Sequence, residues 1–156
     1  MNMEIERKFL VTSEDYKKES YKSERITQAY LNSHPERTVR VRTKGENAYL
    51  TIKGKSSESG LSRFEWEKEI SIDDARELMK LAEPDVIDKT RYLIKQGTHI
   101  FEVDHFHGRN EGLIIAEVEL NSEEEKFEKP AWLGKEVTRD KRYYNSLLSK
   151  KAYKTW

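Results

Sequence analysis

The sequence predicts an α+β fold: an eight-stranded antiparallel closed β-barrel, or tunnel, with a charged lumen and helices packed outside. Two observations favour this fold. Charged residues make up 37% of the 156-residue chain, against roughly a quarter in a typical globular domain. In addition, the strand-like segments carry charges on one parity and apolar side chains on the other. An inward-facing charged surface accounts for both features together.

The alternation begins in residues 3–10, where Glu4, Glu6 and Lys8 alternate with Ile5 and Phe9. Successive side chains of a strand point to opposite faces. A single strand of this kind would normally turn its charges to solvent, but the pattern recurs in the later strands. We therefore interpret the charged faces as one shared surface. Its other members are Arg40, Arg42, Lys53, Arg63, Glu65, Glu67, Lys89, Arg91, Glu102, Asp104, Glu117 and Glu119.

Short connections join most of the expected strands. After residues 3–10, strands are expected at 24–32, up to about 44, up to about 53, and at 63–70, 87–95, 99–106 and 113–121. Pro35, Gly45 and Gly97 mark turns between them. Eight strands joined largely by hairpins can close a barrel, which removes exposed edges. Residues 54–62, rich in Gly and Ser, predict either a mobile loop at the mouth of a site or an uninvolved solvent loop.

Helices are expected at three places, with a small helical turn near residues 122–125. Residues 12–17 predict a short turn, and residues 71–82 predict a helix capped by Ser71 or Asp73 and ended by Pro84. The tail from Asp140 onward predicts a third helix, docked on the strands. Its apolar residues at helical spacing are Tyr143, Tyr144, Leu147, Leu148 and Ala152.

The whole-chain composition limits the classes of function. The length favours a single domain over residues 1–156. Lys plus Arg equals Asp plus Glu at 29 each, so there is no general basic field and nucleic acid is not an expected partner. The chain has no Cys, which excludes disulfides and fits a reducing compartment. With no signal-like or membrane-spanning segment in the sequence, we expect a cytoplasmic protein without a membrane partner.

The charges expected in the lumen indicate the class of ligand. The basic residues are too many for one carboxylate or monophosphate, and a mixture of Arg forks and Lys point charges suits a chain of phosphates. The acidic residues repel one another unless a hard divalent cation lies among them, which predicts Mg²⁺ or Mn²⁺.

The E-x-E-x-K motif at Glu4, Glu6 and Lys8 resembles that of the CYTH, or triphosphate tunnel metalloenzyme, superfamily. The ordered set of motifs covers nearly the whole chain and is far more specific than any one of them. The other matching segments are residues 40–42, 51–53, 63–67, 89–91, 102–104, 117–119 and 136–143. This resemblance implies an eight-stranded antiparallel tunnel and metal-dependent action on a small-molecule triphosphate.

Members of this superfamily differ in substrate, and the sequence favours hydrolysis of inorganic tripolyphosphate to pyrophosphate and phosphate. Class IV adenylyl cyclases carry a His-Phe pair before the first glutamate, whereas Met1, Asn2 and Met3 precede Glu4 here. Thiamine triphosphatases would need an aromatic shelf, but Trp66 lies on the outward parity. A cyclase and a thiamine triphosphatase remain alternatives, as does, from another class, a non-catalytic polyphosphate- or nucleotide-binding module.

The resemblance and the charge pattern assign roles to individual residues. We expect Glu4, Glu6, Glu117 and Glu119 to hold one cation, with Glu6 and Glu119 essential for catalysis. Asp104, or Glu65 with Glu67, is expected to hold a second cation. Lys89 is expected to orient the water or protonate the leaving group. Tyr30 is expected either to bind a terminal phosphate or to pack structurally. The phosphate-clamping residues are expected to be Lys8, Arg40, Arg42, Lys53, Arg63 and Arg91.

His105 and His107 have metal-like spacing but lie on the outward parity of their strand. We therefore do not include them in the tunnel site. The pattern assigns no role to Trp132 or Trp156 and does not indicate an oligomeric state.

Overall fold

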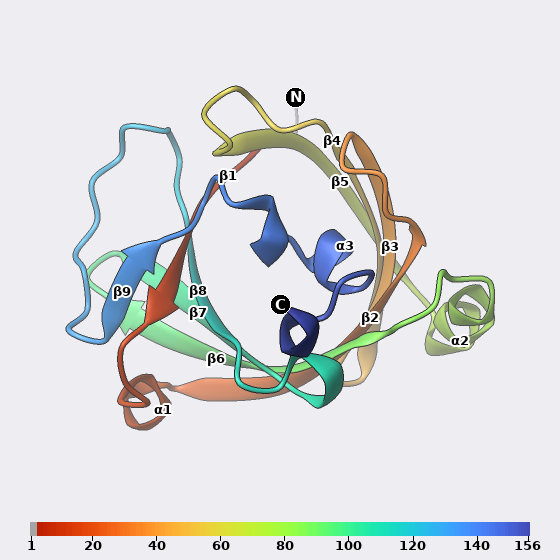
Figure 1. Ribbon diagram of the computed structural model, residues 1–156, viewed down its shortest axis with the longest axis horizontal. Coiled ribbons are helices and arrows are strands. Elements are labelled where there is room, and N and C mark those ends of the chain that lie inside the picture. Colours follow the sequence, from red (N-terminus) through yellow and green to blue (C-terminus); the bar gives the residue numbers. More distant parts are fainter. Residues whose placement is uncertain (1–2) are drawn as a thin grey trace.

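The computed structural model describes residues 3–156 and shows an antiparallel sheet closed into a barrel (Figure 1). Met1 and Asn2, which bear on the cyclase alternative, lie outside the described residues. The strands follow the order β5-β4-β3-β2-β6-β7-β8-β1-β9, and an added β5–β1 pairing closes a ring of eight. The strands are β1 (Met3–Val11), β2 (Lys22–Asn32), β3 (Arg37–Lys44), β4 (Asn47–Gly54), β5 (Ser62–Ile70), β6 (Ile87–Gln96), β7 (His99–Phe106), β8 (Ile114–Glu119) and β9 (Leu133–Glu136). The predicted barrel is confirmed, and β9 is an addition to it.

β1 holds the barrel together because it pairs with three other strands. Its first residues pair with β5, the stretch from Glu6 onward pairs with β8, and its end pairs with β9. Between β5 and β9 two further contacts complete its edge. The backbone N–H of Glu6 donates to the carbonyl of Leu61 at 3.0 Å, and that of Lys8 donates to Oγ1 of Thr138 at 3.0 Å. The backbone of β1 is thus anchored where its charged motif projects inward.

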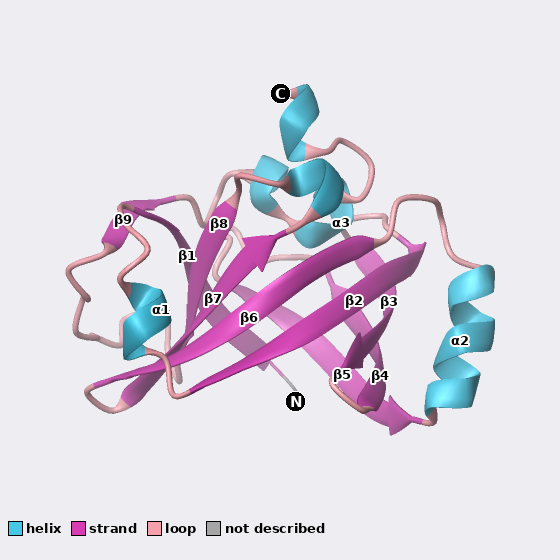
Figure 2. Cartoon of the chain, turned by 90° about the horizontal axis from the view of Figure 1, so that it is seen from below, coloured by secondary structure: helices cyan, strands magenta, loops and turns pink. Residues whose placement is uncertain are grey.

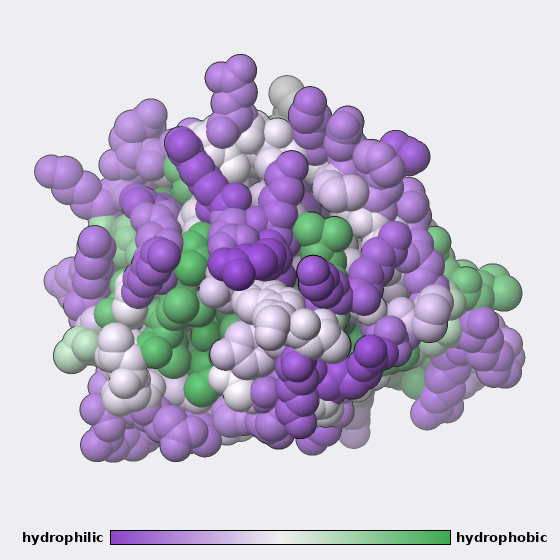
Figure 3. Space-filling model, in the orientation of Figure 1, coloured by the Kyte–Doolittle hydropathy of each residue, from purple (hydrophilic) through white to green (hydrophobic). Residues whose placement is uncertain are grey.

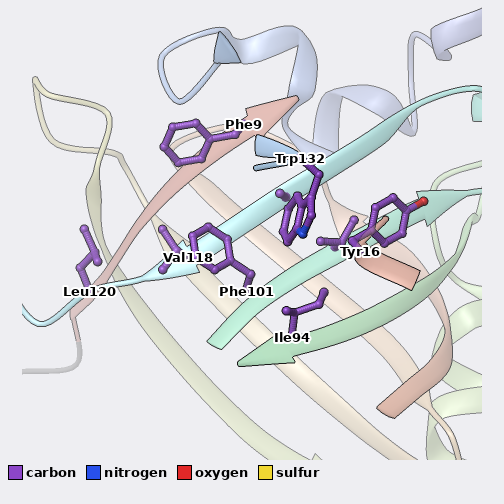
Figure 4. Packing of buried hydrophobic residues seen from close by; sticks show 9 residues of the cluster. Phe9, Tyr16, Ile94, Phe101, Val118, Leu120 and Trp132 are labelled. Atoms are coloured by element: carbon purple, nitrogen blue, oxygen red, sulfur yellow. The ribbon is translucent and has the colours of Figure 1, made fainter. Parts of the chain in front are cut away.

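The main apolar core lies outside the barrel wall, as the outward parity predicts (Figure 4). The Trp132 ring is buried edge-to-face against Phe101 at 5.7 Å and Tyr16 at 6.0 Å between ring centroids. Its Nε1–H donates to the carboxylate of Glu19 at 3.2 Å. The sequence pattern assigned no role to Trp132, and its role is structural. The other buried members of this core are Phe9, Ile94, Val103, Ala116, Val118 and Leu120.

Helices α1 (Tyr16–Glu19) and α2 (Ile72–Lys80) lie outside the barrel, as expected (Figures 1 and 2). Ser71 caps α2, since its side chain accepts a hydrogen bond from the backbone N–H of Asp74 at 3.0 Å. Ala75 packs with Val41 and Ala48 of the wall. Among residues 3–156, no helix combines the length and apolar character needed to cross a bilayer.

The continuous C-terminal helix expected from Asp140 onward is wrong. The chain instead forms short turns, η2 (Lys141–Tyr143), α3 (Asn145–Leu148) and η3 (Tyr153–Thr155), interrupted where Tyr144 and Ala152 adopt extended backbone. Packing overrides helical spacing here, because Tyr143 and Leu148 join a core at one end of the barrel. This segment covers that end (Figure 2), and Figure 3, viewed onto the same end, shows side chains filling the middle of the ring.

Candidate active site

The barrel encloses a cavity of about 190 Å³ whose lining residues are all charged or polar. The predicted site residues line this cavity, with the exception of Asp104. The lining consists of Lys8, Arg40, Arg42, Lys44, Lys53, Arg63, Lys89 and Arg91, of Glu4, Glu6, Glu65, Glu67, Glu102, Glu117 and Glu119, and of Tyr30, Thr38, Thr51, Asn145 and Ser146. The inward charged face inferred from the sequence is therefore one continuous surface.

Glu6 of β1 and Glu119 of β8 are two neighbouring acids with too little positive charge around them. Glu6 lies opposite Glu119 in the strand register, and the ammonium of Lys8 lies 3.4 Å from Glu117 but 3.8 Å from Glu6. Burial, then the carboxylates of Glu117 and Glu4, raises the pKa of Glu6 well above its usual value. Burial, then Glu4 and Glu102, also raises the pKa of Glu119. A nearby cation would stabilise the ionised forms of Glu6 and Glu119. Carboxylate oxygens of this kind are the ligands that Mg²⁺ and Mn²⁺ prefer.

Glu117 differs from its two neighbours because bases surround it. Burial raises the pKa of Glu117, but Lys8, then Arg91 and Lys89, lower it by more, so that the net pKa lies well below the usual value. Glu117 is therefore ionised throughout the neutral range. Its carboxylate forms an ion pair with the ammonium of Lys8.

A second acidic pair lies on β1 and β5. The ammonium of Lys53 donates to the carboxylate of Glu4 at 2.9 Å and lies 3.5 Å from Glu65. Burial opposes ionisation of Glu4, but Lys53 lowers its pKa to about 2 overall. Burial and then Glu4 raise the pKa of Glu65 to about 7. This pair therefore carries between one and two negative charges near neutral pH and responds to any added cation.

Asp104 lies behind the cavity wall instead of on it. It is 1% exposed, and its two oxygens accept hydrogen bonds from Nε of Arg91 at 2.8 Å and Nη2 of Arg91 at 2.9 Å. The ammonium of Lys89 lies 2.8 Å from the same carboxylate. Burial raises the pKa of Asp104, but Arg91 and Lys89 lower it by more. The geometry favours a role in orienting these two bases.

The guanidinium groups of Arg40 and Arg42 on β3 are crowded and only partly neutralised. They share one carboxylate, that of Glu67, at 3.6 and 3.5 Å. Burial, then Arg40 and Arg91, lowers the pKa of Arg42 to about 10. The Nε atoms of both arginines are buried without a hydrogen-bond partner among the described residues. Buried donors with excess positive charge form a binding surface for an anion with several oxygens. Tyr30, paired with Arg40 in the β2–β3 register, lines the same part of the cavity.

Asn145 is a site residue that the sequence analysis missed. Its Oδ1 accepts hydrogen bonds from Nζ of Lys89 at 3.0 Å and from Nε2 of Gln28 at 3.1 Å. Burial lowers the pKa of Lys89 to about 8 even though Asp104 opposes that shift. Asn145 lies in α3, so the C-terminal segment contributes directly to the lumen. The one available signal was Gln28, a polar residue on the inward parity of β2 that needs a partner.

The loop between β4 and β5 borders the interior at the side of β1. Ser56, Gly60 and Leu61 line a recess together with Glu4 and Glu6. Nε of Arg139 donates to the carbonyl of Ser59 at 2.8 Å, which ties the loop to the chain that follows β9. Of the two expectations for this loop, a position at the mouth of the site is the one that the structure supports.

The structure is a closed antiparallel barrel with an ionic lumen and an apolar core packed against the outside of its wall, an arrangement suited to binding a chain of phosphates inside. The CYTH domain profile matches residues 2–153, and the chain belongs to the CYTH family. It is 45% identical over 157 residues to a protein of Acetivibrio thermocellus named inorganic triphosphatase, covering 100% of this chain and 99% of that one. A Nitrosomonas europaea protein of the same name is 37% identical over 150 residues, covering 94% and 96%. The solved structure of an inorganic triphosphatase superposes with a TM-score of 0.64 at 33% identity, covering 96% and 95%.

Proposed function

We propose that this protein is a hydrolase that cleaves inorganic tripolyphosphate to pyrophosphate and phosphate with the help of Mg²⁺ or Mn²⁺. The observation that carries the proposal is the lining of the cavity, where partly neutralised bases lie beside buried carboxylates with raised pKa values. The names of the two nearly full-length relatives support the choice of an inorganic triphosphate.

Glu6 and Glu119 would hold the cation, together with Glu4 and Glu117 at its edge. Their carboxylate oxygens and raised pKa values fit a hard divalent ion. When bound, such an ion neutralises phosphate oxygens and makes a bound water more acidic. Glu65 and Glu67 are the stronger candidates for a second cation, because Arg91 and Lys89 already occupy the oxygens of Asp104.

The basic residues would bind the phosphate chain and stabilise the charge that develops as it breaks. Arg40 and Arg42 can each donate two parallel hydrogen bonds to phosphate oxygens, whereas Lys8 and Lys53 act as point charges. Arg63 and Arg91 extend this surface on β5 and β6, and Tyr30 adds a hydroxyl beside Arg40. Catalysis of phosphoryl transfer rests mainly on positioning and charge stabilisation of this kind.

Lys89 is the group suited to proton transfer. Hydrolysis forms a bond between water oxygen and the terminal phosphorus, breaks the bridging P–O bond and transfers a proton to the leaving pyrophosphate. An ammonium whose pKa is about 8 can donate that proton, and its neutral form can accept one from water. Asp104 and Asn145 hold its Nζ at 2.8 and 3.0 Å. We thus assign Lys89 to proton transfer and Asp104 to its orientation.

A single domain over residues 1–156 and a cytoplasmic location are also part of this proposal, supported by the family match and by the absence of Cys.

The test is to incubate the purified protein with Mg²⁺ or Mn²⁺ and to compare phosphate release from tripolyphosphate, ATP and thiamine triphosphate. Cyclic AMP formation from ATP is measured in parallel. We expect tripolyphosphate to give the highest kcat/KM, with one phosphate and one pyrophosphate per substrate. Cyclic AMP as the main product would establish the cyclase alternative instead. Tight tripolyphosphate binding without turnover would identify a binding module.

A further inference from the structure

Three residues with metal-ligand chemistry meet on the outer surface of the barrel, apart from the tunnel. One ligand atom each from His105, His107 and Glu111 lies within 4.8 Å of the other two. None of the three lines the cavity. They lie at the end of β7 and in the loop that follows it, where the tunnel chemistry gives them no role.

The fold brings these residues together through a tight turn. His105 and His107 share the outward parity, and their ring centroids lie 5.3 Å apart. Gly108, with φ of 63°, starts the short helix η1 (Gly108–Asn110), and the backbone N–H of Glu111 donates to the carbonyl of Gly108 at 3.1 Å. A positive φ is readily adopted by glycine. Glu111 is thereby returned to the side of the two imidazoles.

The ligand atoms are close to the spacing of a bound ion. Zinc bonds of about 2.1 Å in a tetrahedral site put neighbouring ligand atoms roughly 3.4 Å apart. Nε2 of His105 lies 3.3 Å from Oε2 of Glu111. Nδ1 of His105 is buried, so Nε2 is the nitrogen open to an ion. The three ligand atoms lie within 4.8 Å of one another, and the half-exposed side chain of Glu111 can move to shorten the longer separations.

His107 already has the kind of support that metal-binding histidines require. Its Nε2 lies 2.8 Å from Oγ1 of Thr90, an interaction that fixes the ring and leaves Nδ1 to bind an ion. The nearby carboxylate of Asp88 is engaged by the Arg25 guanidinium at 2.6 Å. The backbone of Asp88 helps to place His107, whose N–H donates to the Asp88 carbonyl at 2.9 Å.

We propose that His105, His107 and Glu111 bind one borderline transition-metal ion of the Zn²⁺ class, with water completing the coordination. Two imidazole nitrogens select Zn²⁺, Co²⁺, Ni²⁺ or Cu²⁺ over Mg²⁺, whereas the carboxylate oxygens of the lumen favour Mg²⁺ or Mn²⁺. The protein therefore carries two sites that differ in metal preference. This inference is independent of the proposed function, because it uses no tunnel residue.

The same loop connects the outer site to the cover of the barrel end. Asn110 accepts a hydrogen bond from the backbone N–H of Tyr153 at 2.8 Å through its Oδ1, and Gly112 packs close to the Tyr153 ring. An ion held by Glu111 would restrain the loop that anchors this C-terminal segment. We expect bound Zn²⁺ to slow amide hydrogen exchange at Tyr153.

The test is equilibrium dialysis of the full chain, freed of metal, against buffered Zn²⁺ with millimolar Mg²⁺ present. We expect one Zn²⁺ per chain, with Kd weakened at least about tenfold in both Glu111→Gln and His107→Gln. A second series with Co²⁺ reports nitrogen ligands through its visible absorption. His34→Gln, on the loop before β3, is the matched control and should bind as the wild type does.

Two results would overturn the proposal. One is equal Zn²⁺ affinity of the wild type and Glu111→Gln, a variant whose exposed position does not endanger folding. The other is displacement of the Zn²⁺ by millimolar Mg²⁺, which would place the ion among the carboxylates of the tunnel. Tripolyphosphate turnover with Mg²⁺ should be the same in Glu111→Gln and wild type, so failure of this site and failure of the proposed function are distinguishable.

Discussion

The carboxamide of Asn145 joins the C-terminal segment to the barrel interior, and Asn145→Ala should destabilise the protein measurably. Its Oδ1 accepts hydrogen bonds from two buried donors, Nζ of Lys89 and Nε2 of Gln28. Lys89 keeps its contact with Asp104 after the substitution. Gln28 is fully buried, and Asn145 is its only side-chain partner among the described residues. The substitution thus leaves one buried donor unpaired and weakens a second.

The size of the effect follows from these contacts. A buried donor left without a partner costs about 1–3 kcal/mol, so we expect a loss of about 2 kcal/mol in the free energy of unfolding. For a chain of this length, each kcal/mol shifts the Tm by roughly 2–4 °C, which gives a decrease of about 4–8 °C. Thermal and urea unfolding of the metal-free protein, followed by circular dichroism, measure both quantities.

Two matched variants separate the hydrogen bonds from the packing of α3. Asn145→Asp keeps the acceptor atom and should retain most of the stability. Ser146→Ala removes a hydroxyl from the neighbouring residue of α3, which also lines the cavity, and it should change the Tm little. The reasoning fails if Asn145→Ala unfolds at the wild-type temperature, or if Asn145→Asp loses as much stability as Asn145→Ala.

Further predictions concern pH, phosphate binding and metal removal. The folded-state pKa of Glu65 is raised to about 7. Its contribution to stability is therefore fully present below its unfolded pKa and is lost as the pH rises through 7. The Tm of the metal-free protein should fall between pH 5 and 8, and it should fall less in Glu65→Gln. Identical pH profiles would contradict this. Arg42→Lys loses the two parallel hydrogen bonds of the guanidinium group and should raise KM for tripolyphosphate roughly tenfold. Lys68→Arg on the outer face should leave KM unchanged. Equal KM values for Arg42→Lys and the wild type would show that Arg42 does not bind the substrate. A chelator should abolish turnover reversibly and lower the Tm, as ligand linkage requires, and an unchanged rate in chelator would exclude a metal-dependent reaction.

The charge alternation made the barrel and most of its lining predictable. Parity is a local property, so Glu4, Glu6 and Lys8 can be assigned to one face from residues 3–10 alone. Closure was expected because eight strands joined largely by hairpins are enough to form a barrel. The same alternation predicted that Trp66 points away from the lumen, and Trp66 is exposed on the outer face of the barrel.

The features that were not predictable depend on contacts between distant segments. β9 has only four residues, and Gly134 lies so close to β1 that an added Cβ would meet the carbonyl of Leu10 at 3.0 Å. A close contact between two distant segments leaves no periodic pattern in the sequence. The spacing of the tail predicted a helix, but packing against the end of the barrel broke it into turns and brought Asn145 into the lumen. The orientation of Asp104 toward Arg91 and Lys89 likewise needs the β6–β7 register.

The most direct test of the tunnel as a catalytic site is the rate of phosphate release from tripolyphosphate by Glu6→Gln. Glu77→Gln on the exposed face of α2 is the control, and the unfolding temperature of each metal-free protein is measured beside its rate. We predict a decrease of roughly a hundredfold or more for Glu6→Gln with an equal or higher Tm, because the substitution relieves repulsion among buried carboxylates. Wild-type turnover in a well-folded Glu6→Gln protein would contradict the account.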